Sequence, residues 1–402
     1  MKNGYLSQYF SGVIAKRLSA VEADRRKSNQ HEFNGVAGMK NLFGKDRKKF
    51  TAKFIYLDDD NDAVSDTGFL TWYDARENHP TRSESRLFFP TTAVSRCAAE
   101  NDLLFIGLRP DDSVLVVIAA KESTIASQLV WLFGVDIGEK FSVSDDLEHE
   151  NNRLEYASKC ILEQIGVEIY DQDFNYLDEM LTRFSGSFPT TKVFSEYARS
   201  TLTQVDARDN PDEVLMLWLE REETLFRTLE KHLIEQQLAK GFADVDSFIS
   251  YSLSVQNRRK SRVGQSLENH FEILLQAKNI RYDRTKVTEN RSKPDFIFPG
   301  IKEYHNPAFD TELLTMLGAK STCKDRWRQV LAEADRIEKK HLLTLESAIS
   351  TYQTDEMMSK NLQLVIPRSI HKTYTTAQQN WLMDVTTFIA MLQVRQICAD
   401  GY

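Results

Sequence analysis

Residues 319–335 read AKSTCKDRWRQVLAEAD, and this stretch decides how the second half of the chain folds. The apolar run before it ends at Lys320, as at the end of a strand, and a helical pattern begins at about Asp325. Arg326 and Glu333 are seven residues apart and would share one face of that helix. The predicted buried stripe consists of Trp327, Val330, Leu331, Ala334 and Ile337. Two interpretations compete: a solvated, well-capped helix, or a site where a strand supplies a lysine and a helix supplies recognition groups and a carboxylate.

The composition is that of an ordinary globular protein. With 402 residues, 41% hydrophobic and 27% charged, the chain is long for one domain, and two domains are expected. The apolar run at 114–120 is too short to span a bilayer, and the first ten residues lack the apolar centre of a secretory signal. These features predict a cytoplasmic protein.

The charge and the cysteine content argue against several classes of protein and of metal site. The four cysteines are scattered, which predicts neither a disulfide framework nor a structural zinc site. A net charge of -8 argues against a general polyanion binder. The cationic run NRRKSR at 257–262 is either a solvated surface or a local contact for nucleic acid.

The pattern of elements predicts an α+β multidomain protein. Residues 1–150 contain short runs rich in aromatic and β-branched residues, typical of a small barrel-like β domain. Residues 151–186 turn helical and form a connector, with a break at 184–191. Residues 187–402 alternate helices and strands, which predicts an α/β sandwich.

Two long helices open this second half. The first is expected to begin at Asn210 as N-cap with Pro211 in the first position, and to end at Gly241. The next helix carries an apolar stripe. Its members are Val263, Leu267, Phe271 and Leu274.

The charged residues of the second half suit phosphodiester hydrolysis. That reaction needs a hard divalent cation held by carboxylates and a positive charge near the attacking water. Asp295 opens one strand and Lys320 ends a later one, but Gly318 stands where nucleases of this pattern commonly carry a carboxylate. Glu333 and Glu268 are candidates for the missing carboxylate. Each residue also has a simpler interpretation, with Asp295 as a turn or cap, Glu333 as a solvated charge and Asp325 as a helix cap.

Three segments carry a family resemblance. SVQNRRKSRVGQSLENH, KPDFIFP and KSTCKDRWRQVLAEAD resemble the catalytic domain of EcoRII-type restriction endonucleases, the CC…GG-reading branch of the PD-(D/E)XK nucleases, over roughly 187–402. The resemblance implies an active site of Glu268, Asp295, Lys320 and Glu333. Asp295 and Glu333 would ligate Mg²⁺, Lys320 would position water or stabilise charge, and Glu268 would order a second ion or water.

The resemblance also implies DNA contacts. It assigns Lys324, Asp325 and Arg326 to the CC/GG steps, and lysine, arginine and aspartate can indeed bond to guanine and cytosine edges in the major groove. Arg262 lies in a matched segment and is a further expected contact. Trp218 lies close to where the family places its base-flipping residue, and it is either a stacking surface for an extruded base or a core tryptophan.

The N-terminal half resembles the same enzymes more faintly. YFSGVIAKRLSA and TRSESR resemble two arms of the EcoRII effector domain, a B3-like β pseudobarrel that binds a second copy of the site. The arms would contain Lys16 and His31, and Arg82, Glu84 and Arg86, respectively. Such arginine–glutamate clusters are also common as surface salt bridges. Pro80 and Ser85 stand where the family has lysines, so this domain would bind more weakly or read a different base pair.

These inferences predict a Mg²⁺-dependent type II restriction endonuclease. The effector-dependent kind is one form that this prediction allows. Its partners would be double-stranded DNA and a second copy of itself, because such sites are two-fold symmetric. A companion DNA methyltransferase would protect the host site. The alternatives are a catalytically silent DNA-binding regulator and a repair or junction nuclease.

Overall fold

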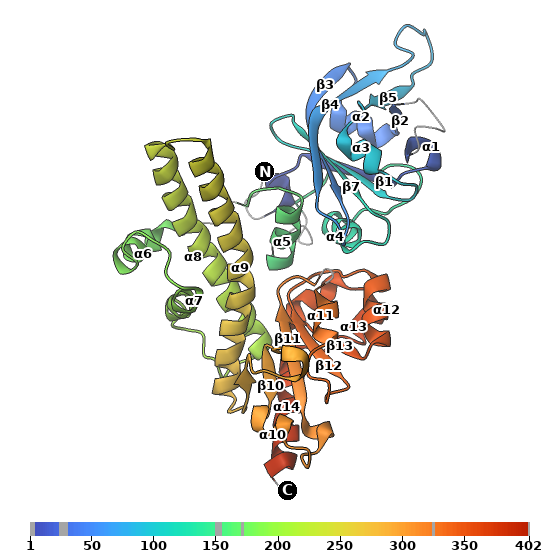
Figure 1. Ribbon diagram of the computed structural model, residues 1–402. Helices are drawn as coiled ribbons and strands as arrows, with labels where there is room; N and C mark the ends of the chain where they lie inside the picture. The colour runs from blue at the N-terminus through green and yellow to red at the C-terminus, as the bar shows by residue number, and fades with distance from the viewer. Residues whose placement is uncertain (1–4, 24–30, 149–154, 170–172, 324–325, 401–402) are drawn as a thin grey trace. The chain divides into compact units, whose positions relative to one another are not determined.

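The computed structural model describes residues 5–23, 31–148, 155–169, 173–323 and 326–400. The chain divides into two compact units, one of residues 1–169 with 347–354 and one of residues 170–346 with 355–402. Each unit contains both helices and strands, which confirms the predicted α+β class (Figure 1).

The first unit is built on one curled sheet of eight strands, in the order β2-β5-β4-β3-β7-β6-β1-β8. Neighbouring strands are antiparallel except β3 and β7, which are parallel. The runs predicted as strands form β3 to β7, whereas β1, β2 and β8 were not predicted. Their bounds are β1 (Gly12–Arg17), β2 (Glu32–Asn34), β3 (Lys48–Leu57), β4 (Val64–Asp74), β5 (Ser85–Phe88), β6 (Leu103–Leu108), β7 (Val114–Ala119) and β8 (Ser142–Ser144).

Both faces of this sheet are apolar. Successive side chains of a strand point to opposite faces, so each face carries an apolar cluster of its own. Val13 and Ala15 of β1 pack into one core cluster, whereas Ile14 between them packs into the other. Helices α4 and α5 contribute to the first cluster, and α2 and α3 contribute to the second. The helices of this unit are η1 (Leu6–Gln8), α1 (Ala20–Ala23), α2 (Ala37–Phe43), α3 (Ala93–Cys97), α4 (Thr124–Phe133) and α5 (Tyr156–Gln164).

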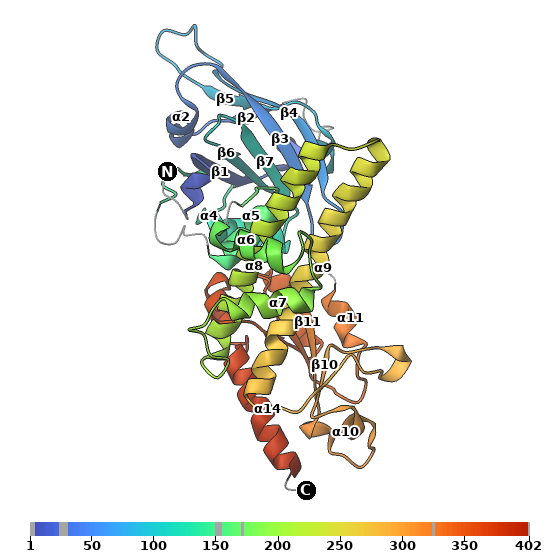
Figure 2. The same cartoon turned by 90° about the vertical axis from the view of Figure 1, so that its left-hand side faces the viewer.

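Two long helices dominate the N-terminal part of the second unit. Helices α8 (Pro211–Lys240) and α9 (Val245–Ala277) lie side by side in both views (Figures 1 and 2). The Asn210 side chain accepts a hydrogen bond from the Asp212 amide at 3.0 Å, and Gly241 ends α8 with φ +75°. Both predicted ends of this helix are confirmed. The shorter helices here are η3 (Phe174–Tyr176), α6 (Leu177–Arg183) and α7 (Thr191–Ser200).

A mixed sheet of five strands forms the rest of the second unit, in the order β13-β12-β11-β10-β9. Strands β11, β12 and β13 run parallel, whereas β10 is antiparallel to both of its neighbours. The strands are β9 (Asp283–Arg284), β10 (Phe296–Phe298), β11 (Thr315–Lys320), β12 (Lys340–Thr344) and β13 (Leu362–Val365). The remaining helices are η4 (Glu289–Arg291), α10 (Ile301–His305), η5 (Thr311–Leu313), α11 (Trp327–Leu331), α12 (Thr351–Ser359), η6 (Arg368–Thr373), α13 (Thr376–Gln379) and α14 (Val385–Asp400).

The helix predicted from about Asp325 to Ile337 is much shorter than expected. Helix α11 ends at Leu331, and Ala334 adopts a left-handed backbone with φ 52°. Trp327 and Val330 are fully buried, so the tight packing of this segment overrides its helical pattern. Arg326 and Glu333 therefore do not share a helix face, contrary to the prediction, because Glu333 lies beyond the end of α11.

Across the residues that the structure describes, no helix combines the length and the apolarity needed to cross a bilayer.

Candidate active site

Strands β10 and β11 bring an aspartate and a lysine into contact. Asp295 directly precedes β10, and Lys320 ends the antiparallel neighbour β11. The Asp295 Oδ2 atom accepts hydrogen bonds from the Lys320 ammonium at 2.8 Å and from the Ala319 amide at 2.7 Å. The Asp295 carboxylate is thus fixed by the strand that carries the lysine.

Gly318 has no room for a side chain. A Cβ atom at this position would lie 2.9 Å from Cγ2 and 3.2 Å from Cγ1 of Val330 in α11. Because Val330 is fully buried, it cannot easily move aside. The position two residues before Lys320 is therefore closed to a carboxylate, as long as α11 packs on the sheet in this way.

Glu333 approaches the same two residues from the turn after α11. Burial, followed by the nearby Asp295 carboxylate, raises the pKa of Glu333 to about 6, although the Lys320 ammonium opposes both effects. Within the described residues, no hydrogen-bond donor reaches its buried Oε2 atom. A buried carboxylate oxygen without a donor is costly unless a cation or water completes it.

Glu268 of α9 also faces this group. Burial and the Asp295 carboxylate raise its pKa, whereas Arg284 and Lys320 oppose the shift. Arg284 of β9 donates to Glu268 at 2.7 Å and to Glu272, one turn further along α9, at 2.6 Å. The four predicted catalytic side chains thus lie together, and Arg284 is an additional member that the sequence did not suggest.

The donor chemistry fits a hard divalent cation. The Asp295 carboxylate helps to raise the pKa of Glu333, and within the described residues no donor reaches one oxygen of Glu333. Within the described part of the chain, no three aspartate, glutamate, histidine or cysteine side chains are gathered as a metal-binding group. Mg²⁺ ordinarily takes one or two protein carboxylates and completes its shell with water and phosphate oxygens. Two carboxylates are therefore enough.

The predicted recognition triplet is only partly described. Lys324 and Asp325 lie outside the described residues, and Arg326 is exposed immediately before α11. On one side of the triplet, the buried Cys323 donates its amide to Glu346 at 2.8 Å. On the other side, Trp327 is fully buried. Both ends of the segment are therefore anchored in the core.

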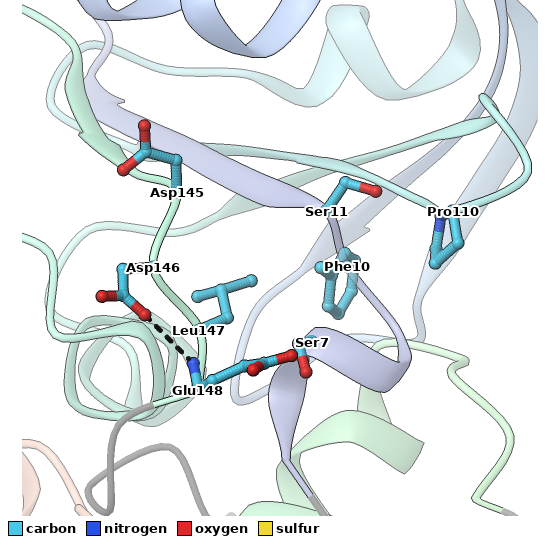
Figure 3. Close-up of a pocket in the computed structure, with 8 residues that line it drawn as sticks. All are labelled: Ser7, Phe10, Ser11, Pro110, Asp145, Asp146, Leu147 and Glu148. Carbon is cyan, nitrogen blue, oxygen red and sulfur yellow. Dashed lines mark hydrogen bonds between the residues drawn. The ribbon is translucent and has the colours of Figure 1, made fainter. Parts of the chain in front are cut away.

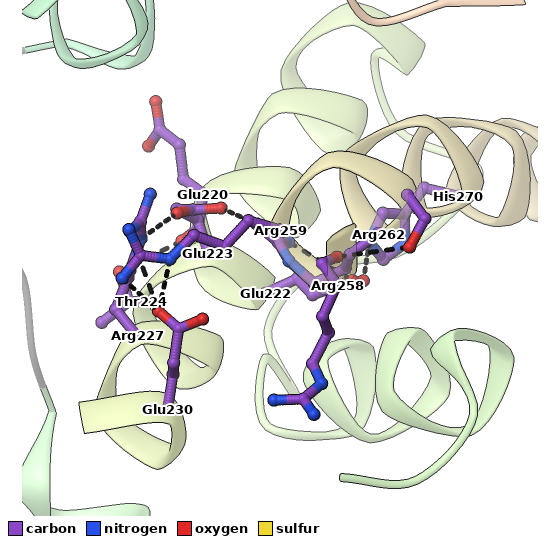
Figure 4. Close-up of polar contacts among 11 residues, drawn as sticks. Glu220, Glu222, Glu223, Thr224, Arg227, Glu230, Arg258, Arg259, Arg262 and His270 are labelled. Carbon is purple, nitrogen blue, oxygen red and sulfur yellow. Dashed lines mark hydrogen bonds and ion pairs between the residues drawn. The ribbon is translucent and has the colours of Figure 1, made fainter. Parts of the chain in front are cut away.

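Arg262 lies between α8 and α9 instead of on the surface (Figure 4). Its guanidinium is 3.6 Å from Glu222, pairs with Glu223, and lies 4.1 Å from the centre of the Phe226 ring. Because Arg262 is only 6% exposed, this arrangement favours a structural role over the predicted DNA contact.

A buried histidine joins the same network. His270 Nε2 lies 2.9 Å from Glu222 Oε2, and the Arg199 guanidinium lies 3.0 Å from His270 Nδ1. Burial lowers the pKa of His270, although its contact with the Glu222 carboxylate opposes this shift. The sequence contains no spacing signal for this pair, since the two partners come from different helices.

Trp218 packs inside the second unit. The Arg199 guanidinium carbon is 5.8 Å from its ring centre, and the His270 ring is 5.7 Å away. Its side chain is almost fully buried, although it lines a hollow of about 440 Å³ beside Arg199. Of the two interpretations left open, this geometry favours the core tryptophan.

The predicted DNA contacts of the first unit lie in different settings. Lys16 is buried and pairs with Glu22 at 2.7 Å. His31 packs against Phe89 with 5.6 Å between ring centres. Arg82 is exposed.

The remaining two residues of the second arm are partners of each other. Arg86 pairs with Glu84 and, at 3.3 Å, with Glu32 of β2. Glu84 also accepts from Arg76 at 2.7 Å. These contacts match the salt-bridge interpretation, and Arg82 is the exposed cation of this arm.

A hollow of about 400 Å³ in the first unit is lined by acidic groups (Figure 3). Asp145, Asp146 and Glu148 line it together with the Phe10 ring. Their negative charge opposes that of a phosphate backbone, so this hollow is unsuited to hold DNA.

Comparison with known proteins identifies relatives of the second unit. Residues 226–389 match the family model described as EcoRII C terminal. The chain is 42% identical over 206 residues to the type II restriction enzyme EcoRII of Escherichia coli. The C-terminal part of the chain is therefore similar to the C-terminal domain of EcoRII. This confirms the resemblance predicted from the sequence, although the match spans only 50% of the EcoRII chain and 51% of this one.

More distant similarities are to one further curated enzyme and to two solved protein–DNA complexes. The chain is 26% identical over 214 residues to the type II restriction enzyme SsoII of Shigella sonnei, covering 46% of this chain and 68% of that one. A structure of metal-depleted Ecl18kI with uncleaved, modified DNA matches at 19% identity and a TM-score of 0.45, over 56% of this chain and 84% of that one. A PspGI–substrate DNA complex matches at 18% identity and a TM-score of 0.44, over 54% of this chain and 95% of that one.

Proposed function

We propose that this chain is a type II restriction endonuclease that makes Mg²⁺-dependent double-strand cuts in DNA at a short CC…GG-type site. The observation that carries the proposal is the grouping of Asp295, Lys320 and Glu333 inside an EcoRII-like domain. The two carboxylates supply oxygen ligands, and the lysine supplies a positive charge beside them. Phosphodiester hydrolysis uses this combination of groups.

Each residue of this group has a separate proposed role in hydrolysis. Bound by Asp295 and Glu333, Mg²⁺ would polarise the phosphate and lower the pKa of a water molecule. The Lys320 ammonium, held at 2.8 Å by Asp295, is placed to orient the attacking water or to stabilise charge on the phosphate. Glu268, held by Arg284, orders water at the edge of this group.

Base recognition is proposed for the segment between Lys320 and α11. Lys324 and Arg326 would donate to guanine, and Asp325 would accept from cytosine. Extrusion of a central base onto Trp218 requires its ring to separate from Arg199 and His270. Fluorescence of 2-aminopurine at the central position tests this step, since an unstacked base would brighten only on site-specific binding.

The first unit is proposed as a B3-like effector module, with Arg82 as its exposed contact. The enzyme would act in the cytoplasm as a homodimer, and a methyltransferase would protect the host site. Cleavage of DNA with one site should then be slow, and an uncleavable oligonucleotide carrying the site should accelerate it. Arg82→Ala should reduce that acceleration. Equal rates on one-site and two-site plasmids would exclude an effector role.

Digestion of a plasmid of known sequence with Mg²⁺, followed by sequencing of the ends, tests the main proposal. Cuts at one repeated CC…GG sequence are expected, and Lys320→Ala should produce none. A random distribution of ends or cuts at branched DNA alone would favour a repair nuclease. Site-specific binding with no cutting under any divalent metal would favour a silent regulator.

A further inference from the structure

The Glu333 turn is the segment 332–337, in which Glu333 directly precedes a turn at 334–337, and it is held in place from several sides. Its backbone closes on itself through a bond from the Ile337 amide to the Ala334 carbonyl at 2.9 Å. From outside, the Ser292 hydroxyl donates to the Ala332 carbonyl at 3.4 Å. The Asp335 amide donates to the Glu289 carboxylate, which lies outside the turn, at 3.3 Å. The turn is therefore a defined structure and not an open loop.

Lys340 supplies the innermost of these contacts. Its ammonium donates to the carbonyls of Ala334 and Ile337, both at 2.8 Å, and so bridges the two ends of the turn. Lys340 is the first residue of β12, which pairs with β11 through His341 and Leu317. The bridge thus ties the Glu333 turn to the sheet that presents Lys320.

A lysine buried to this degree is unusual. Only 6% of Lys340 is exposed, and burial lowers its pKa, although Asp335, Glu289 and Glu333 favour its charged form. Buried ammonium groups are costly unless their donors are satisfied. Two carbonyl acceptors and three carboxylates nearby offset that cost. The Lys340 side chain takes no part in the proposed chemistry, so its burial indicates another role.

We propose that Lys340 is a positioning residue for the metal site: its two hydrogen bonds hold the turn so that the Glu333 carboxylate faces Asp295 and Lys320. Gly318 excludes a carboxylate from β11, and Ala334 follows Glu333 in a left-handed conformation that a loose turn would not keep. Without Lys340, Glu333 would sample positions outside the reach of an ion shared with Asp295. The inference rests on the proposed metal-dependent function.

The test is direct binding of Mn²⁺ to the full-length protein, followed by electron paramagnetic resonance, which requires no DNA and no cleavage. Lys340→Met should weaken Mn²⁺ binding by about 10–100-fold, as expected when a group that orients a metal ligand is removed. Lys340→Gln, which can still donate to a carbonyl, should lie between Lys340→Met and wild type. The exposed neighbour provides a matched control, and Lys339→Met should bind Mn²⁺ like wild type.

A double variant separates positioning from general damage. Glu333→Gln should weaken Mn²⁺ binding, and adding Lys340→Met should weaken it no further, because Lys340 acts through Glu333. A folded Lys340→Met protein that binds Mn²⁺ within twofold of wild type would overturn the inference while leaving the metal site intact. If that variant does not fold, Lys340→Gln decides by the same criterion. Unchanged binding in Glu333→Gln would overturn the proposed metal site and the inference together.

Discussion

Replacing Gly318 by alanine tests why the second carboxylate lies outside the strand. The added Cβ would meet Val330 at 2.9 Å and 3.2 Å, distances that require one of the two groups to shift. Leu342 of β12 lies 3.6 Å from the same point, so the only route open is to push α11 away from the sheet. Glu333 follows Val330 by three residues and would move with it.

Overpacking of a well-packed core costs about 1–3 kcal/mol. Gly318→Ala should therefore lower the free energy of unfolding by that amount, although alanine is otherwise favoured over glycine in a strand. Val330→Ala alone should cost about 2 kcal/mol through lost burial of two methyl groups. In the double variant these methyl groups are absent, so the combined cost should fall short of the sum by about 1–2 kcal/mol.

Urea unfolding of the full-length protein measures these values, provided that the slope of each transition is unchanged between variants. Plasmid cleavage in parallel should decrease in Gly318→Ala and recover in part in the double variant. The reasoning would be refuted by strict additivity of the two substitutions. It would also fail if Gly318→Ala were as stable as wild type within about 0.5 kcal/mol.

Four further outcomes are expected. Lys320→Ala should abolish cleavage yet keep site-specific binding in gel-shift assays, because it removes charge stabilisation and not groove contacts; cutting within tenfold of wild type would contradict this. Because the pKa of Glu333 is raised to about 6, protons compete with the metal below that pH, so the Mg²⁺ concentration for half-maximal cleavage should fall as pH rises through about 6. In metal-free protein the protonated form of Glu333 favours folding, so its contribution to stability should be lost as pH rises from about 4.5 to about 6, and a flat melting profile over that range would exclude the shift. Arg262→Met should lower the free energy of unfolding by about 3–5 kcal/mol while leaving base-pair discrimination unchanged, since it strips a buried partner from Glu222 and Glu223. Loss of discrimination at full stability would restore Arg262 as a DNA contact.

Local signals in the sequence were enough for the long elements. Asn210, Pro211 and Gly241 each act on the backbone of their own helix end, so α8 could be bounded without knowledge of its surroundings. The segment after Lys320 was different, because its helical pattern is real but its end is set by contacts with residues far away in the chain. Glu333 was a candidate both from a predicted helix face that does not form and from the resemblance, whereas the turn that holds it could not be read from spacing.

The residues that were missed share one property. Arg284, His270 and Lys340 act through partners on other elements, and a sequence pattern does not state which elements meet. Arg262 was misjudged for the same reason: in a cationic run it looks like surface, and only the packing of α8 against α9 reveals its buried carboxylate partners.

The charges hidden between α8 and α9 also act as a register lock. Sliding one helix by a turn, about 5.4 Å, would break at least one of the contacts that Glu222 makes with Arg262 and His270, and would leave a buried polar group without that partner. An apolar interface would tolerate such a slip far better. Glu268 stands on α9 only two residues before His270, so the lock sets the height at which this carboxylate reaches the edge of β11. The helix pair thus fixes the position of a proposed catalytic carboxylate, although α8 itself contributes no proposed catalytic group.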